Sequence, residues 1–211
     1  MNRISFVAAL GLAAGVTAGP LPAQSIDCGA VHFGIMGGAT RPVRDVAYLT
    51  HLDWNLGALV MFGAPSSHLN VRVDGQWQQL AGKEPIRGAY ALCPGCNGPV
   101  GPFAQDYRVL DLTTNLVYNF APLSRASFYL IGGVGVYYER QSDRGGSASE
   151  ELTGFGVNGG AGVKFKLGRL QPFVEARYHT ISGGHSFAYG DGIYQATNNF
   201  QFIPINVGIV F

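Results

Sequence analysis

The chain has 211 residues, of which 47% are hydrophobic and only 13% are charged, and its formal net charge is +1. The low charge combined with 13 Phe and 10 Tyr excludes an intrinsically disordered chain, and the near-zero net charge gives no sign of a nucleic-acid partner. Beyond the N-terminus there is no run of about 18 uninterrupted apolar residues, which excludes a bundle of membrane-spanning helices.

The N-terminus has the pattern of a secretory signal peptide. Arg3 supplies a positive start, an apolar run extends from Ile4 to Val16, and Ala23 offers a small residue for cleavage. Cleavage after Ala18 is the alternative. We therefore expect a signal peptide over 1–23, a short periplasmic segment over 24–29 and one barrel domain over 30–211.

From Ala30 onward, apolar and polar residues alternate with a period of two, which indicates β-strands. Each segment is roughly the 9–11 residues that a tilted strand needs to cross a bilayer. The eight segments cover 31–38, 52–62, 69–77, 110–120, 127–139, 155–167, 173–179 and 203–211.

The connections between these segments alternate in length. Tight turns are expected at 63–68, 121–125 and 168–169, and longer loops at 41–51, 81–106, 141–153 and 182–198. Short periplasmic turns and long external loops are typical of outer-membrane barrels. The sequence thus predicts an all-β fold, an eight-stranded antiparallel up-and-down transmembrane β-barrel with both termini on the periplasmic side.

Steric volume predicts which face of each strand points outward. Eight strands enclose an interior just wide enough for side chains to fill, and rows of Phe, Leu and Trp would overpack it. Only lipid tolerates a continuous apolar band of this size on the outside. We expect glycines and short polar residues to line the lumen.

Charged residues at the inward positions form a candidate lumen network in which acids and bases nearly balance. One interpretation is a set of paired charges that fills the barrel, because buried charges persist mainly when paired. The other is a gated path for protons or ions. The residues are Asp53, Arg72, Asp74, Asp111, Glu139, Lys164, Lys166, Glu175 and Arg177.

Two cysteines, Cys93 and Cys96, lie in the longest loop with the spacing of a redox dithiol. A redox motif of the thioredoxin type needs a strand-to-helix context that this sequence lacks. We predict a local disulfide that closes the loop, with metal binding and redox chemistry as alternatives. Cys28 falls at the other end of a barrel roughly 25 Å tall and is not expected to pair within the chain.

The chain resembles the opacity-type or OmpA-like superfamily of eight-stranded outer-membrane β-barrels over about residues 30–211. The resemblance rests on the terminal run IPINVGIVF and on two strands, Phe128–Tyr138 (FYLIGGVGVYY) and Pro172–His179 (PFVEARYH). It implies residence in the outer membrane of a Gram-negative-type bacterium. It also implies a signal for the barrel-assembly machinery, formed by Ile205, Val207, Ile209 and Phe211.

The superfamily does not imply one activity. We expect a structural or adhesin-like surface-interaction role, with an occluded lumen and with 82–105 and 183–198 as the contact loops. We expect no enzymatic activity, cofactor, metal or nucleic-acid partner. The expected partners are outer-membrane lipid and lipopolysaccharide, the barrel-assembly machinery and an unidentified extracellular ligand, and the expected state is a monomer.

Two alternatives remain. A lipid hydrolase similar to the outer-membrane lipid A deacylases would use His179 or His185 as a base. However, His179 and Ser182 have the spacing His-x-x-Ser rather than His-x-Ser, and alternation turns His179 into the lumen. The second alternative is a narrow pore.

Overall fold

The computed structural model describes residues 31–44, 47, 50–64, 66–83, 105–143, 149–182, 185–189, 192–196 and 200–211. The expected signal peptide, the segment 24–29, and Cys28, Cys93 and Cys96 lie outside these ranges. No helix in the described part of the chain is long and apolar enough to cross a membrane.

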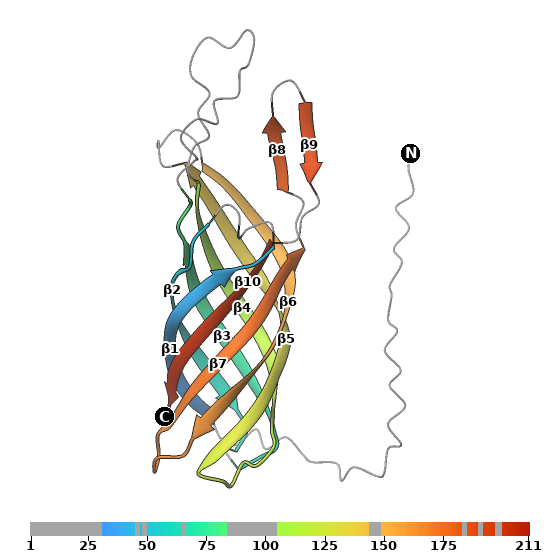
Figure 1. Ribbon diagram of the computed structural model, residues 1–211. Coiled ribbons are helices and arrows are strands. Elements are labelled where there is room, and N and C mark those ends of the chain that lie inside the picture. The colour runs from blue at the N-terminus through green and yellow to red at the C-terminus, as the bar shows by residue number, and fades with distance from the viewer. Residues whose placement is uncertain are drawn as a thin grey trace, which may run out of the picture.

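Eight strands form a closed antiparallel barrel in the order β1-β10-β7-β6-β5-β4-β3-β2 (Figure 1). The barrel strands are β1 (Val31–Pro42), β2 (Asp53–Phe62), β3 (Leu69–Leu80), β4 (Gln105–Asn119), β5 (Ala126–Asp143), β6 (Ser149–Phe165), β7 (Gln171–Ser182) and β10 (Phe200–Val210). Two further strands, β8 (His185–Tyr189) and β9 (Gly192–Ala196), form a separate hairpin. The eight-stranded barrel predicted from the alternation is confirmed.

The barrel closes because the first and last strands pair along most of their length. The register of β1 with β10 runs from Gly34 opposite Val210 to Pro42 opposite Phe202, and β1 pairs with β2 on its other side. Closure leaves no strand edge in the wall, so the wall keeps its backbone polar groups within the ladder.

The two ends of the barrel differ. Three short connections, over 63–68, 120–125 and 166–170, join strands at one end, which we call the turn end. The other end is the loop end (Figure 1): longer segments follow β1, β3 and β7 there, and β5 is joined to β6 over 144–148. At the turn end, Gly63 has a φ of 125° and Gly168 a φ of 66°, a region that favours glycine.

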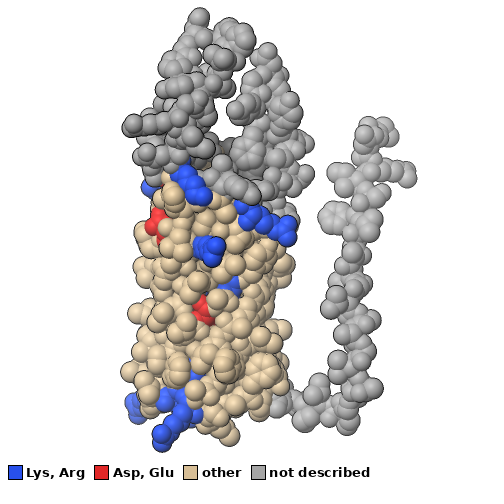
Figure 2. Space-filling model, viewed as in Figure 1, with Lys and Arg blue, Asp and Glu red and all other residues tan. Residues whose placement is uncertain are grey.

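Alternation places apolar side chains on the outer surface. In β4, Leu112 is 60% exposed, whereas its neighbours Asp111 and Thr113 are buried. The same contrast recurs in the other barrel strands, and the barrel wall seen in Figure 2 is mostly uncharged. The outer surface is therefore an apolar band, as the steric argument predicts.

Two of the expected loops contain strand. The sequence predicts a long loop over 141–153, but β5 and β6 continue as a polar hairpin up to the pair Ser142 and Ser149. Polar side chains on both faces suit a hairpin that rises above an apolar wall, so the loss of alternation there does not end the strands. Within 182–198, β8 and β9 pair from His185 opposite Ala196 to Tyr189 opposite Gly192.

The interior also differs from the prediction of glycines and short polar residues, since it contains two buried apolar clusters. The cluster at the loop end comprises Leu80, Tyr107, Val109, Tyr137, Ile181, Phe200 and Phe202. The cluster at the turn end comprises Met36, Leu59, Met61, Val117, Tyr129, Ile131, Phe173 and Val210.

Inward-facing glycines make room for these rings. A Cβ built on Gly208 would overlap the ring of Phe173, and one on Gly162 would overlap the ring of Tyr129. A Cβ on Gly156 would lie 2.7 Å from Cε2 of Tyr137. The glycines of the wall and the aromatic rings of the lumen are therefore complementary, which is why the interior holds large side chains without overpacking.

This complementarity predicts that Gly156→Ala destabilises the barrel by about 1–3 kcal/mol, the usual cost of overpacking. The added Cβ would meet the Thr180 carbonyl oxygen at 2.6 Å as well as the ring of Tyr137. Chemical unfolding of the detergent-folded protein, followed by tryptophan fluorescence, measures the change.

Gly159→Ala on the same strand is the matched control, because its Cβ would face outward with its nearest neighbour 3.9 Å away. We expect that variant to be neutral or slightly stabilising. Equal destabilisation by both substitutions would contradict the proposed packing of rings against glycines.

Candidate functional site

A network of buried polar side chains lies inside the barrel between the two apolar clusters. Alternate positions of β3, β4 and β7 supply it, because residues two apart on a strand share a face. In the strand order, β3 and β7 are four steps apart in either direction, so they lie on opposite sides of the lumen. Contacts between these two strands therefore cross the barrel.

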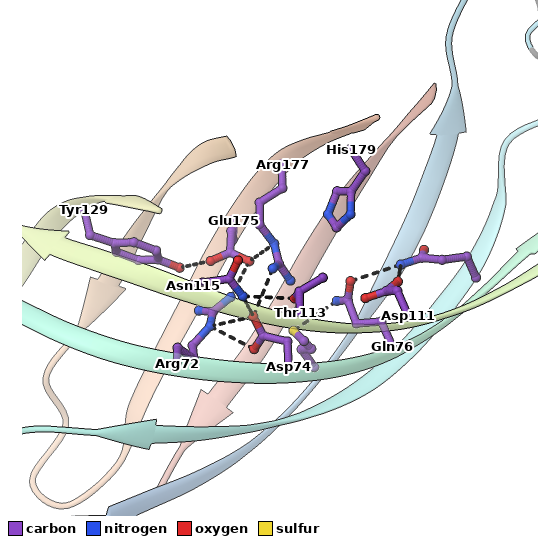
Figure 3. A network of polar contacts seen from close by, with 12 residues as sticks. Arg72, Asp74, Gln76, Asp111, Thr113, Asn115, Tyr129, Glu175, Arg177 and His179 are labelled. Carbon is purple, nitrogen blue, oxygen red and sulfur yellow. Dashed lines mark hydrogen bonds and ion pairs between the residues drawn. The ribbon is translucent and has the colours of Figure 1, made fainter. Parts of the chain in front are cut away.

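Four charged residues form the centre of the network, which we call the ion quartet: Arg72 and Asp74 from β3, and Glu175 and Arg177 from β7 (Figure 3). Across the lumen, Arg72 Nη2 lies 2.8 Å from Glu175 Oε1, and Arg177 Nη1 lies 2.9 Å from Asp74 Oδ2. Within each strand, Arg72 Nε lies 2.9 Å from Asp74 Oδ1, and Arg177 Nε lies 2.8 Å from Glu175 Oε1. Each carboxylate thus contacts both guanidinium groups.

The quartet is almost completely buried. Its side chains are between 0% and 4% exposed. Removing charges from water is costly, and close opposite charges offset that cost only when the remaining polar atoms are also satisfied. Two cations and two anions make the quartet neutral overall.

Neutral side chains add hydrogen bonds to the carboxylates (Figure 3), although Asp74 Oδ1 has only its ion-pair contact with Arg72. The Tyr129 hydroxyl donates to Glu175 Oε2 at 2.8 Å, and Asn115 Nδ2 donates to Asp74 Oδ2 at 2.7 Å. Asn115 also donates to the Thr113 hydroxyl at 3.0 Å. These bonds add support from β4 and β5, so four strands converge on the quartet.

A second polar group lies nearer the loop end. Gln78 Nε2 donates to Gln76 Oε1 at 3.0 Å and to Asp111 Oδ2 at 3.3 Å, and Gln76 Nε2 lies 3.1 Å from the sulfur of Met36. The Thr40 hydroxyl donates to Gln78 Oε1. Asp111 therefore accepts a hydrogen bond from the amide group of Gln78 and, unlike the acids of the quartet, forms no ion pair among the described residues.

His179 is packed as an interior side chain. It is fully buried, its ring stacks on Phe202 with centroids 4.9 Å apart, and its Nδ1 lies 3.0 Å from the Tyr137 hydroxyl. Ser182 is exposed on the opposite face of the same strand. The histidine and the serine therefore do not meet. Among the described residues, no group of three or more His, Cys, Asp or Glu could hold a metal ion.

The other residues of the predicted lumen set lie apart from the quartet. Asp53 is half-buried at the start of β2, where its Oδ1 accepts from the Trp54 backbone N–H at 2.8 Å. Glu139 is buried toward the loop end, and Lys164 is half-buried beside a small cavity of about 20 Å³ at the turn end. The prediction for Lys166 is wrong, because Lys166 is exposed just beyond the end of β6.

The outward side chains of the predicted assembly signal lie on β10 and at its end. Ile205 and Val207 are exposed on the outer surface, and Ile209 is half-buried. The backbone N–H of Phe211 donates to the carbonyl of Phe33 at 2.9 Å, and the N–H of Phe33 donates back at 3.3 Å. Phe211 thus extends the pairing that closes the barrel.

The sequence interpretation omitted the neutral members of the network: Gln76, Gln78, Thr113, Asn115 and Tyr129. Their inward positions follow from the same alternation that identified the charges. Which of them bond to which charges depends on the cross-lumen geometry, which the alternation does not contain.

The network predicts that Glu175→Gln destabilises the barrel by about 3–5 kcal/mol, because two buried guanidinium groups would then share one carboxylate. Chemical unfolding of the detergent-folded protein measures the loss. Glu151→Gln is the matched control, since Glu151 and Arg140 form an ion pair of 3.8 Å with side chains about half exposed. That control is expected to cost less than about 1 kcal/mol, and similar costs for both variants would exclude a stabilising quartet.

No protein-family model matches the chain, and no curated protein matches its sequence. Several solved structures match its fold. Neisserial surface protein A (NspA) is 12% identical, with a TM-score of 0.56 over 85% of this chain and 95% of that chain. OprG from Pseudomonas aeruginosa is 18% identical, with a TM-score of 0.52 over 86% and 96%.

A major outer membrane protein from Thermus thermophilus is 12% identical, with a TM-score of 0.50 over 86% of this chain and 98% of that chain. At these identities the likeness concerns the fold. The chain therefore has the fold of the eight-stranded outer-membrane β-barrels, which is the fold that the resemblance predicts.

Proposed function

We propose that the chain is an integral outer-membrane barrel with a structural or surface-interaction role. The observation that carries the proposal is the closed barrel with an apolar outer band and a charged, buried interior. A protein folded in water would bury the apolar face, and only hydrocarbon accommodates an exposed band of this extent. The shared fold with NspA, OprG and the Thermus protein, whose names describe surface or outer-membrane proteins, supports this location.

The proposed orientation puts the turn end in the periplasm and the loop end outside the cell. Short turns on one side and long loops on the other are typical of outer-membrane barrels. The proposal includes a signal peptide over 1–23 and a disulfide between Cys93 and Cys96 in the longest loop. Contact with an extracellular ligand would then fall to the loops over 82–105 and 183–198.

An occluded lumen is part of the proposal. Support comes from the ion quartet, whose contacts join opposite strands, and from the buried apolar clusters on both sides of it. Ions crossing the barrel would have to separate these buried pairs, which is costly because each partner would be left buried without its counter-charge.

A non-enzymatic role is favoured over lipid hydrolysis. In such a hydrolase the base takes the proton from the nucleophile that attacks the ester carbonyl, so both have to lie together where the lipid binds. His179 is stacked on Phe202 inside the barrel, whereas Ser182 lies on the opposite face of the strand. The proposed partners are accordingly outer-membrane lipid, lipopolysaccharide, the barrel-assembly machinery and an extracellular ligand, and the proposed state is a monomer.

Deleting Phe211 tests location, closure and assembly together. We expect outer-membrane fractions to lose most of the heat-modifiable, folded species, because the deletion removes both backbone bonds to Phe33 and the terminal aromatic residue. Gel migration of boiled and unboiled samples measures the folded fraction.

Phe211→Trp is the conservative control, since it keeps an aromatic side chain and the backbone bonds. It is expected to assemble normally. Full assembly of the deletion variant would remove the terminal signal from the proposal, and absence of the complete chain from outer-membrane fractions would overturn the proposed location.

Planar-bilayer recordings test the occluded lumen. We expect no steady current from the folded chain, and none from the double variant Arg72→Ala, Glu175→Ala, because the two apolar clusters remain on either side of the quartet. A 16-stranded porin recorded under the same conditions is the positive control. A steady ohmic current from the unaltered chain would favour the pore alternative.

A further inference from the structure

The turn end carries an exposed group of cations that the lumen network does not use. Arg125, Lys166 and Arg169, which we call the basic collar, are all exposed and lie on neighbouring turns. The Lys166 backbone N–H donates to the Arg125 carbonyl at 2.8 Å, which joins the two turns. Arg169 occupies the tip of the turn closed by mutual backbone bonds between Leu167 and Leu170. Figure 2 shows Lys and Arg gathered at this end of the barrel.

No Asp or Glu side chain lies on the described surface around the collar. Among the described side chains, Asp74, Asp111 and Glu175 are buried in the lumen, and the other acidic residues lie toward the loop end. The ion pairs within the described ranges belong to the quartet and to Arg140 with Glu151. The collar charges therefore remain available for an external anion.

The cations of the collar are interleaved with exposed apolar side chains. Leu167 and Leu170, which bracket Arg169, are 64% and 45% exposed, and Leu123 in the neighbouring turn is 77% exposed. Phe165, which is 43% exposed, precedes Lys166 on the lipid-facing side of β6. Long cationic side chains that extend from apolar surroundings toward a polar layer are typical of the bilayer interface.

We propose that the basic collar binds the phosphate groups of anionic glycerophospholipids in the periplasmic leaflet. This proposal rests on the proposed membrane location and orientation. Each cation near an anionic lipid surface contributes attraction, and the leucines and the phenylalanine contact the adjoining acyl chains. An anionic polymer in the aqueous periplasm, such as the cell wall, would satisfy the charges but would leave the apolar side chains in water, so the phospholipid fits both features.

A tryptophan placed beside the collar reports the lipids that surround it. The chain has two tryptophans, Trp54 and Trp77, so Trp54→Phe and Trp77→Phe give a background free of tryptophan, and Phe165→Trp adds the reporter. The full chain is folded into phosphatidylcholine vesicles that contain the same fraction of either brominated phosphatidylglycerol or brominated phosphatidylcholine. Quenching by each brominated lipid gives its local abundance.

We expect phosphatidylglycerol to be enriched roughly fivefold beside the reporter, the effect of about one cation acting fully on an anionic headgroup. In the variant Arg125→Gln, Lys166→Gln, Arg169→Gln the enrichment should disappear, and in the unaltered collar it should weaken as salt is raised. The matched control neutralises three exposed arginines at the loop end, Arg41→Gln, Arg108→Gln and Arg140→Gln, and should keep the enrichment.

The outcomes separate this proposal from the proposed function. Absence of quenching by both lipids would mean that the chain is not in the bilayer, which overturns the proposed function. Equal quenching by both lipids with an intact collar would overturn the phospholipid site while leaving the barrel in the membrane. Equal quenching together with collar-dependent sedimentation on purified peptidoglycan would assign the collar to the cell wall instead. If the neutralised variant fails to fold, the salt dependence of the intact collar decides the question.

Discussion

The closed backbone ladder is the constraint on which the rest of this structure depends. In the proposed membrane location, the outer face of the wall has no water to satisfy unpaired N–H and C=O groups, so its strands need partners on both sides. Pairing of β1 with β10 meets this need, and the bonds between Phe33 and Phe211 continue the pairing to the last residue. Closure with eight strands in turn fixes a narrow lumen, and the narrow lumen dictates what the inward positions hold.

The side chains of the narrow lumen are arranged in layers. Aromatic rings fill the lumen opposite glycines of the wall, as Phe173 does beside Gly208, and the polar layer lies between two apolar clusters. Buried ion pairs are weak evidence for stability in general, because desolvation offsets their attraction. Here the cross-lumen bonds of Arg72 and Arg177 link β3 to β7, two strands that lie on opposite sides of the ring and are not paired with each other.

Alternation in the sequence is sufficient to predict the strands, their faces and the closed barrel, because a period of two is visible wherever one face of a strand is apolar and the other polar. It fails where that asymmetry ends. The part of the β5–β6 hairpin beyond Glu139 is mostly polar, so its sequence shows no alternation of apolar and polar residues. The strands β8 and β9 fall within a glycine-rich segment, where the alternation is also missing. The period of two by itself assigns Lys166 to the lumen. In the structure β6 ends at Phe165, and the Lys166 side chain beyond it is exposed.

The ion pairs between β3 and β7 could not be predicted from the sequence for another reason. Alternation along the strands shows that Asp74 and Arg177 both face inward. Which inward residues lie at the same height along the barrel axis depends on the stagger between neighbouring strands, accumulated over four steps of the ring.

The geometry of the barrel also limits where the molecule can recognise a partner. In the proposed membrane location and with the proposed occluded lumen, only the two ends of the barrel are open to a partner. At the loop end, β5 and β6, the longest strands of the barrel, continue as a mostly polar hairpin. The turn end has an exposed apolar rim and carries the basic collar. In the proposed function the two ends therefore suit different partners: a solvated ligand at the loop end and lipid headgroups at the turn end.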